Sequence, residues 1–212
     1  MDGATFIGRF REETMDEEAP YLWPDALILR YLDEAQVAFC RRTEGIEDST
    51  SPICTVAVPA GATSVALSPK ILKVRAAYLA ETGHTLEIGS VEGARRDGVL
   101  PRTGTPHTIL LKLSAKAAQI IPAPATDVTL KLDVFRLPLK TVDASDATEV
   151  DDVHSTTLMH YALYRAYSRP DPDAMDRVRA DYFHQLFLDD CREAKREQGR
   201  ARKPNGATIF SW

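Results

Sequence analysis

Histidines and cysteines are the residues of this 212-residue chain whose types and spacing could hold a metal or carry catalysis. His154 and His160 stand six residues apart in a segment of helical periodicity. Because six residues turn a helix by about 600°, their side chains diverge and make a poor ligand pair. Cys40, Cys54 and Cys191 are widely spaced and form no C-x-x-C or zinc-type pattern. We therefore expect no metal, and three reduced, mostly buried thiols.

Motifs of the common enzyme and nucleotide-binding classes are missing. The chain contains no G-x-x-x-x-G-K-S/T, G-x-G-x-x-G, G-x-S-x-G or H-E-x-x-H. Its most motif-like stretch, Gly104-Thr105-Pro106-His107, fits a turn before a strand. Carboxylates are many, but they fall in loops and on helix faces, where solvation explains them. We expect no catalytic residues, no cofactor and no enzymatic activity.

Charge is distributed unevenly along the chain. The net charge of −5 argues against a dedicated nucleic-acid binder. Residues 1–34 carry nine acids against three arginines, and residues 143–152 carry five acids and no base. Residues 192–203 carry six bases against two acids. Such asymmetry can guide electrostatic pairing between subunits or with a partner, although plain solvated surface is the alternative.

Targeting and membrane signals are not found. No run approaches the roughly 18 apolar residues of a membrane span. The start, Met1-Asp2-Gly3-Ala4, lacks the basic residues and apolar run of a secretion signal. We therefore expect the protein to mature in a cytoplasm.

Helical periodicity marks both ends of the chain. A short helix is expected over 3–18, closed by Pro20. A clearer helix follows Pro24 and ends before Gly45, with an apolar stripe at i, i+3 and i+4 spacing. Two more are expected from His154 to before Pro170 and from about Met175 to Gln198, with Gly199 ending the last. The aromatic residues of this pair fit a helix–helix core better than a stacking platform for bases; they are Tyr161, Tyr164, Tyr167, Tyr182, Phe183 and Phe187.

The middle of the chain has the pattern of short strands. Segments rich in Val, Ile, Leu and Thr alternate with Gly and Pro turns, which predicts a small antiparallel sandwich or barrel. Residues 46–52 and 90–105 are expected to be loops. The predicted strands are 53–58, 63–67, 70–80, 85–88, 107–113, 117–121 and 127–137.

These elements predict an α+β fold in which a helical bundle carries an inserted β domain. Residues 1–49 and 139–199 form the bundle, and 50–138 form the small antiparallel β insertion, whose two ends lie close together. Residues 200–212 are an extended C-terminal tail.

The order of these parts resembles the head–tail adaptor, or head–tail connector, proteins of tailed bacteriophages, a group that includes tail tubular protein A of podoviruses. The resemblance covers nearly the whole chain and departs from the family at Asp33, where Asn is usual, and in the basic, aromatic-ended tail. It is carried by Trp23-Pro24-Asp25, Leu29-Arg30-Tyr31-Leu32-Asp33-Glu34-Ala35, Leu67-Ser68-Pro69, Ile71-Leu72-Lys73-Val74, Gly104-Thr105-Pro106, Pro122-Ala123-Pro124, Arg136-Leu137-Pro138, Val153-His154 and Leu158-Met159-His160-Tyr161-Ala162-Leu163-Tyr164-Arg165-Ala166-Tyr167.

The resemblance implies a non-enzymatic structural protein of the virion that assembles in the host cytoplasm. Such subunits form a ring, commonly twelvefold, between the portal and the next tail or neck component. Double-stranded DNA passes through the ring without specific binding, and no cofactor or membrane is involved. Another neck component, such as a stopper, is the nearest alternative. A small-ligand binding module with a pocket in the β domain is the second, and a bound molecule in native mass spectrometry would favour it.

The C-terminal tail is the sharpest candidate for a partner interface. A Pro-Asn-Gly turn separates its charges from its apolar end, and ordering a chain end costs about 1–2 kcal/mol per residue. The tail therefore orders only where its aromatic side chains are buried, and Trp and Arg are common interface anchors. The candidate interface residues are Arg200, Arg202, Lys203, Ile209, Phe210 and Trp212.

We predict that this tail docks onto the portal or the neighbouring subunit. Deleting residues 200–212 should leave the melting temperature nearly unchanged and weaken ring or portal binding at least about tenfold. Calorimetry and a binding titration measure the two effects. Normal assembly of the truncated chain would rule the anchor out, and a much lower melting temperature would place the tail in its own core.

Overall fold

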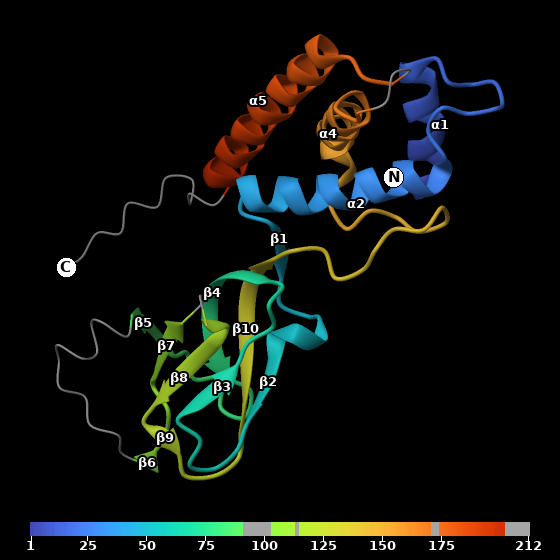
Figure 1. The fold of residues 1–212 in the computed structure, drawn as a ribbon. Helices are drawn as coiled ribbons and strands as arrows, with labels where there is room; N and C mark the ends of the chain where they lie inside the picture. Colours follow the sequence, from blue (N-terminus) through green and yellow to red (C-terminus); the bar gives the residue numbers. More distant parts are fainter. Residues whose placement is uncertain (91–102, 113–114, 171–173, 202–212) are drawn as a thin grey trace. The chain divides into compact units, whose positions relative to one another are not determined.

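The computed structural model describes residues 1–90, 103–112, 115–170 and 174–201. The chain divides into two compact units, Met1–Gly45 with the described part of Pro138–Trp212, and Ile46–Leu137. The first unit is helical and the second is built of strands (Figure 1). The predicted α+β fold class is therefore confirmed.

Helices make up the first unit, and their ends follow from local hydrogen bonds. The Asp2 carboxylate accepts the Thr5 backbone N–H at 2.7 Å and caps α1. This helix is shorter than predicted because Met15 takes a left-handed conformation and ends it. We had predicted that Gly199 ends the last helix. That prediction was wrong, since α5 continues to Ala201. The described helices are α1 (Gly3–Thr14), α2 (Asp25–Arg42), α4 (Ser155–Tyr167) and α5 (Arg177–Ala201), with a 3-10 turn at Asp152–His154.

Apolar and aromatic side chains hold these helices together. The predicted stripe of α2 is buried, with Ile28 and Leu32 fully inaccessible. Between α4 and α5, the Tyr161 and Phe187 ring centroids lie 5.0 Å apart. The aromatic series is thus a helix-pair core, as expected, except that Tyr182 is 60% exposed.

A loop of acidic composition, residues 139–151 (hereafter the acidic loop), is fastened to α1 and α2. Gly3 N–H donates to the Asp146 carbonyl at 3.0 Å. On α2, Asp33 Oδ1 accepts Val142 N–H at 2.9 Å, and Gln36 Oε1 accepts Glu149 N–H at 2.9 Å. A Cβ on Gly3 would lie 2.4 Å from a carbonyl oxygen of this loop, so only glycine fits there.

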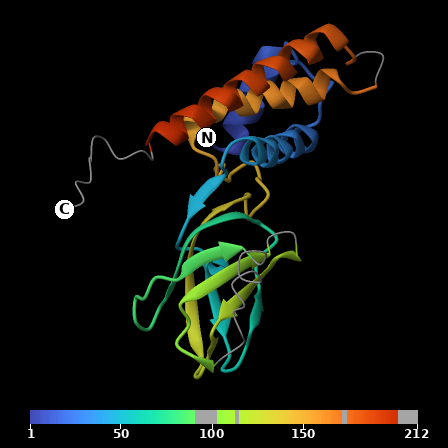
Figure 2. The same ribbon diagram turned by 90° about the vertical axis from the view of Figure 1, so that its left-hand side faces the viewer.

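Among the described residues of the second unit, the strands form two four-stranded sheets and one two-stranded sheet (Figures 1 and 2). In the first, β10 pairs with β1, β2 and β4; the second has the order β3-β8-β7-β5. Pairing is antiparallel except for β5 with β7 and β6 with β9. The described strands are β1 (Ile46–Asp48), β2 (Thr55–Val58), β3 (Ser64–Ala66), β4 (Ile71–Leu79), β5 (Glu87–Ser90), β6 (Thr103–Gly104), β7 (Thr108–Lys112), β8 (Ala117–Ile121), β9 (Ala123–Pro124) and β10 (Val128–Arg136), with a 3-10 turn at Pro52–Cys54.

Both four-stranded sheets contribute to one apolar core. Along β10, Leu130, Leu132 and Val134 are buried while Lys131 and Asp133 between them are partly exposed. Core residues from β7 and β8 belong to the same cluster. The alternation that predicted half-buried strands is therefore correct, and the unit is a small sandwich.

The ends of the β unit pair with each other. Ile46 of β1 stands opposite Arg136 of β10, so the chain leaves the unit beside the point where it enters. This strand lies in the stretch 46–52 that we had predicted to be a loop, and that prediction was wrong. Asp48, only 8% exposed, forms an ion pair with Arg136. Burial alone would raise the pKa of Asp48, but hydrogen bonds from Ser51, Thr50 and Arg136 outweigh it and hold this pKa well below 3.8.

This ion pair predicts acid sensitivity of the β unit. Because the folded pKa of Asp48 is lowered, its stabilising effect is full above pH about 4 and is lost as pH falls further. Asp48→Asn should lower the free energy of unfolding by about 3 kcal/mol at neutral pH. It should also make this free energy fall less steeply as the pH is lowered below about 4. Urea unfolding at several pH values measures both. Asp133→Asn, the same charge loss on β10, should change little; equal effects of the two variants would refute the assignment.

The adjacent ends also predict that the β unit is an insertion. Replacing Ile46–Leu137 by a short Gly/Ser linker should leave a soluble helical protein that unfolds cooperatively, because the linker spans a short gap. Circular dichroism during heating measures this. Loss of all cooperative unfolding would show that the two units share one core.

Candidate partner-binding surfaces

The histidines and cysteines have structural neighbours. His160 Nδ1 lies 2.8 Å from Asp190 Oδ2, and the His154 ring packs on Phe39 at 4.6 Å between centroids. The two histidines thus face different partners, as their spacing predicted. Within the described ranges, no group of three or more His, Cys, Asp or Glu side chains is arranged to hold a metal.

All three cysteines are free and buried. Burial raises the pKa of the Cys191 thiol to about 12, and it also raises the pKa of Cys54. A thiolate is the reactive form of cysteine, so these side chains are unsuited to nucleophilic chemistry.

Part of the acidic N-terminal region serves the fold itself. Arg11 is 8% exposed and donates to Asp16 Oδ2 at 3.0 Å, to the Trp23 carbonyl at 3.2 Å and to Asp25. The Tyr21 ring lies over its guanidinium, 3.5 Å from Cζ to the ring centroid. Asp16 is therefore an internal partner of a buried cation, whereas Asp25 pairs with the same cation from a side chain that is 61% exposed. The other exposed acids of this part are Asp2, which caps α1, and Glu12, Glu13, Glu17 and Glu18.

A cavity of about 500 Å³ lies between the start of α2 and the end of α4. Three arginines are among the residues that line it, Arg30, Arg165 and Arg169, and we call it the arginine pocket. The Tyr31 ring supports two of them, with Arg165 Cζ at 5.6 Å and Arg30 Cζ at 5.8 Å from its centroid. The other lining residues are Pro24, Leu27, Ser168 and Pro170.

Glu34 pairs with two of these arginines. It forms ion pairs with Arg165 and, at 3.8 Å, with Arg30. Burial alone would lower the pKa of Arg165, but Tyr161 and Glu34 raise it, so its guanidinium is charged at every physiological pH. The guanidinium groups of Arg30 and Arg165 thus share one carboxylate, and their donor geometry matches that of carboxylates.

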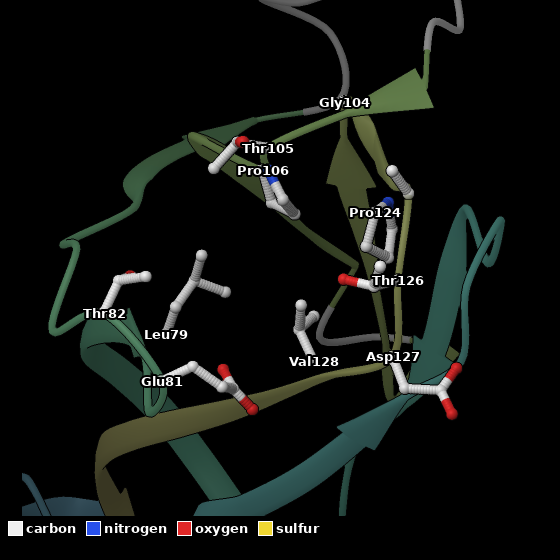
Figure 3. A pocket seen from close by; sticks show the side chains of 11 residues that line it. Leu79, Glu81, Thr82, Gly104, Thr105, Pro106, Pro124, Thr126, Asp127 and Val128 are labelled. Carbon is white, nitrogen blue, oxygen red and sulfur yellow. The ribbon is translucent and has the colours of Figure 1, made fainter.

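The β unit has a smaller cavity of about 300 Å³, shown in Figure 3. Leu79, Val128, Pro106 and Pro124 give it apolar walls. Its two carboxylates already accept backbone hydrogen bonds: Glu81 from Thr129 at 2.7 Å and Asp127 from Ala60 at 2.8 Å. The carboxylates at its rim are thus structural acceptors. Gly104, Thr105 and Pro106 of the motif-like stretch line this cavity, and the stretch leads into β7, consistent with its interpretation as a turn before a strand.

Only one of the predicted interface residues of the tail lies within the described residues. Arg200 is exposed in the last turn of α5. Arg202, Lys203, Ile209, Phe210 and Trp212 lie outside the described residues, so docking of the tail stays a prediction. The arginine pocket was not predicted, since its residues are far apart in the sequence.

In the part of the chain that the structure describes, no helix is both long and apolar enough to cross a bilayer.

Comparison with known proteins gives one result. The family model described as SU10 adaptor protein matches residues 1–208, which include both units. No curated protein matches the chain.

Proposed function

Because this chain belongs to the SU10 adaptor protein family and is thus a structural component of a phage virion, we propose that it is a head–tail adaptor. Its copies form a ring between the portal and the tail. The observation that carries the proposal is the family match over residues 1–208, which spans the helical unit and the β unit together. The narrower likeness to tail tubular protein A of podoviruses is part of the proposal.

A ring needs each subunit to present two complementary surfaces, because a heterologous contact repeated around an axis closes on itself. The helical unit has charged surfaces of both signs: the arginine pocket and the acidic loop. Twelve copies and a downstream tail or neck component complete the proposed assembly.

DNA passes through the proposed ring without being held. The net charge of −5 disfavours binding to phosphate, since DNA affinity depends on cationic side chains that displace counterions. Such a ring extends the DNA channel.

A single experiment tests the adaptor proposal. The purified chain should be a weakly associating monomer in light scattering and should form a ring when the portal encoded by the same phage is added. A stable closed dimer that does not bind the portal would contradict the proposal. Binding only beneath a ring made by another protein would identify a stopper instead.

A further inference from the structure

We propose that the C-terminal tail of one copy docks into the cavity in the β unit of a neighbouring copy, with Trp212 as its anchor. This cavity, hereafter the β-unit cavity, is the one in Figure 3. It is lined by the turn after β4 and by the segments that lead into β7 and β10. The contact, which rests on the proposed adaptor function, joins subunits around the ring.

The β-unit cavity, about 300 Å³ in volume, combines apolar walls with hydrogen-bond acceptors. Leu79, Val128, Pro106 and Pro124 form the walls. Figure 3 shows that the Thr126 hydroxyl turns into the space between them. None of the described residues that line the cavity carries a positive charge. A ligand that fits it therefore has an apolar body together with hydrogen-bond donors or cations.

Glu81 supplies the negative charge of this cavity. Hydrogen bonds from its own backbone N–H and from Thr129 lower the pKa of Glu81, so its carboxylate is ionised at neutral pH. These bonds leave part of its acceptor capacity, since a carboxylate has about four acceptor positions. In Figure 3 this carboxylate lies beside Leu79 and Val128, whereas that of Asp127 points away from the cavity. A donor inside the cavity can thus reach Glu81.

Strand pairing and hydrogen bonds hold the walls in place before a ligand binds. Gly104 of β6 stands opposite Pro124 of β9, whose carbonyl also accepts the Gly61 N–H at 2.8 Å. Leu79 of β4 stands opposite Leu130 of β10. Because these residues are already fixed, docking costs little loss of conformational freedom in the cavity.

The C-terminal tail has the composition that such a cavity favours. Trp212 joins a large apolar ring system to an indole N–H, which can donate to the Glu81 carboxylate. The bases Arg202 and Lys203 complement the negative charge of the cavity. The only other tryptophan of the chain, Trp23, is 3% exposed in the helical unit and is not available for docking.

The tail is long enough to reach another copy. Residues 202–212 follow the end of α5 and span up to about 35 Å when fully extended. A chain that gives its tail to one neighbour keeps its own cavity open for the tail of the next. The contact is therefore heterologous and can be repeated around an axis, which is how subunits close a ring.

A peptide titration tests the contact. The probe is a synthetic peptide of residues 200–212 with a fluorescent label at its first residue. The receptor is the full chain with Trp212→Ala, whose own tail lacks the anchor. Fluorescence anisotropy at low salt should show saturable binding. Adding Thr126→Arg to the receptor should weaken binding at least about tenfold, because a long cationic side chain then fills the cavity and repels the bases of the peptide.

The matched control for the receptor is Thr63→Arg, the same substitution at an exposed threonine of the β unit that does not line the cavity. It should bind the peptide like the parent receptor. A peptide with Trp212→Ala should bind at least about tenfold more weakly, and one with Ser211→Ala should bind normally. The inference is overturned if the peptide does not bind, if both receptor variants weaken it equally, or if the peptide without its tryptophan binds as well.

Sedimentation velocity of the full chain without portal shows which copy supplies the tail. The wild type should associate with rising concentration, and chains with Trp212→Ala or Thr126→Arg should associate at least about tenfold more weakly. An equimolar mixture of these two variants should form a complex of one copy of each, because the first keeps an intact cavity and the second an intact tail.

A wild type and a mixture that both stay monomeric although the peptide binds would place each tail in the cavity of its own chain, and would overturn the inference. Portal binding is measured separately. A chain that shows the expected complexes but does not bind the portal contradicts the adaptor proposal alone.

Discussion

The pairing of β1 with β10 is the constraint on which the rest of the structure depends. It places Ile46 beside Arg136, so a segment of some ninety residues leaves and re-enters the helical unit at one point. The Asp48–Arg136 ion pair joins the same two strands where the chain enters and leaves the β unit. Because the two ends meet, α2 and α4 can pack against each other although the whole β segment separates them in the sequence.

Polar side chains of α1 and α2 fix the loops that adjoin these helices. Asp33 and Gln36 use their oxygens to hold backbone N–H groups of the acidic loop, and Arg11 organises Asp16 and Asp25. Charges that looked like one acidic region in the sequence therefore divide into two classes. Some are internal partners of the fold, and others are held outward at defined places where a second molecule can meet them.

Periodicity was enough to predict the helices and strands that bury a whole face. Polar residues alternate with Leu130, Leu132 and Val134, and the apolar stripe of α2 repeats with helical spacing. These patterns predicted the buried residues and the α+β fold class. The short strand β1 was not predicted, because it consists of one apolar residue and two acids. The neighbouring sequence also does not indicate that Asp48 is buried against Arg136. Gly199 was read as a terminator, yet α5 passes through it, since a single glycine costs only about 1 kcal/mol in a helix.

The arginine pocket shows a second limit of sequence reasoning. Arg30 is on α2 and Arg165 on α4, more than one hundred residues later in the sequence, and Arg169 follows the end of α4, so no spacing rule connects them. The packing of α4 on α2 brings both side chains to the Tyr31 ring and to Glu34. The family resemblance suggested a ring but could not say which surfaces build it.

Electron cryomicroscopy of the phage neck tests the central claim most directly. The account predicts a closed ring of copies of this chain against the portal. A neck in which this chain forms no ring at the portal would contradict it.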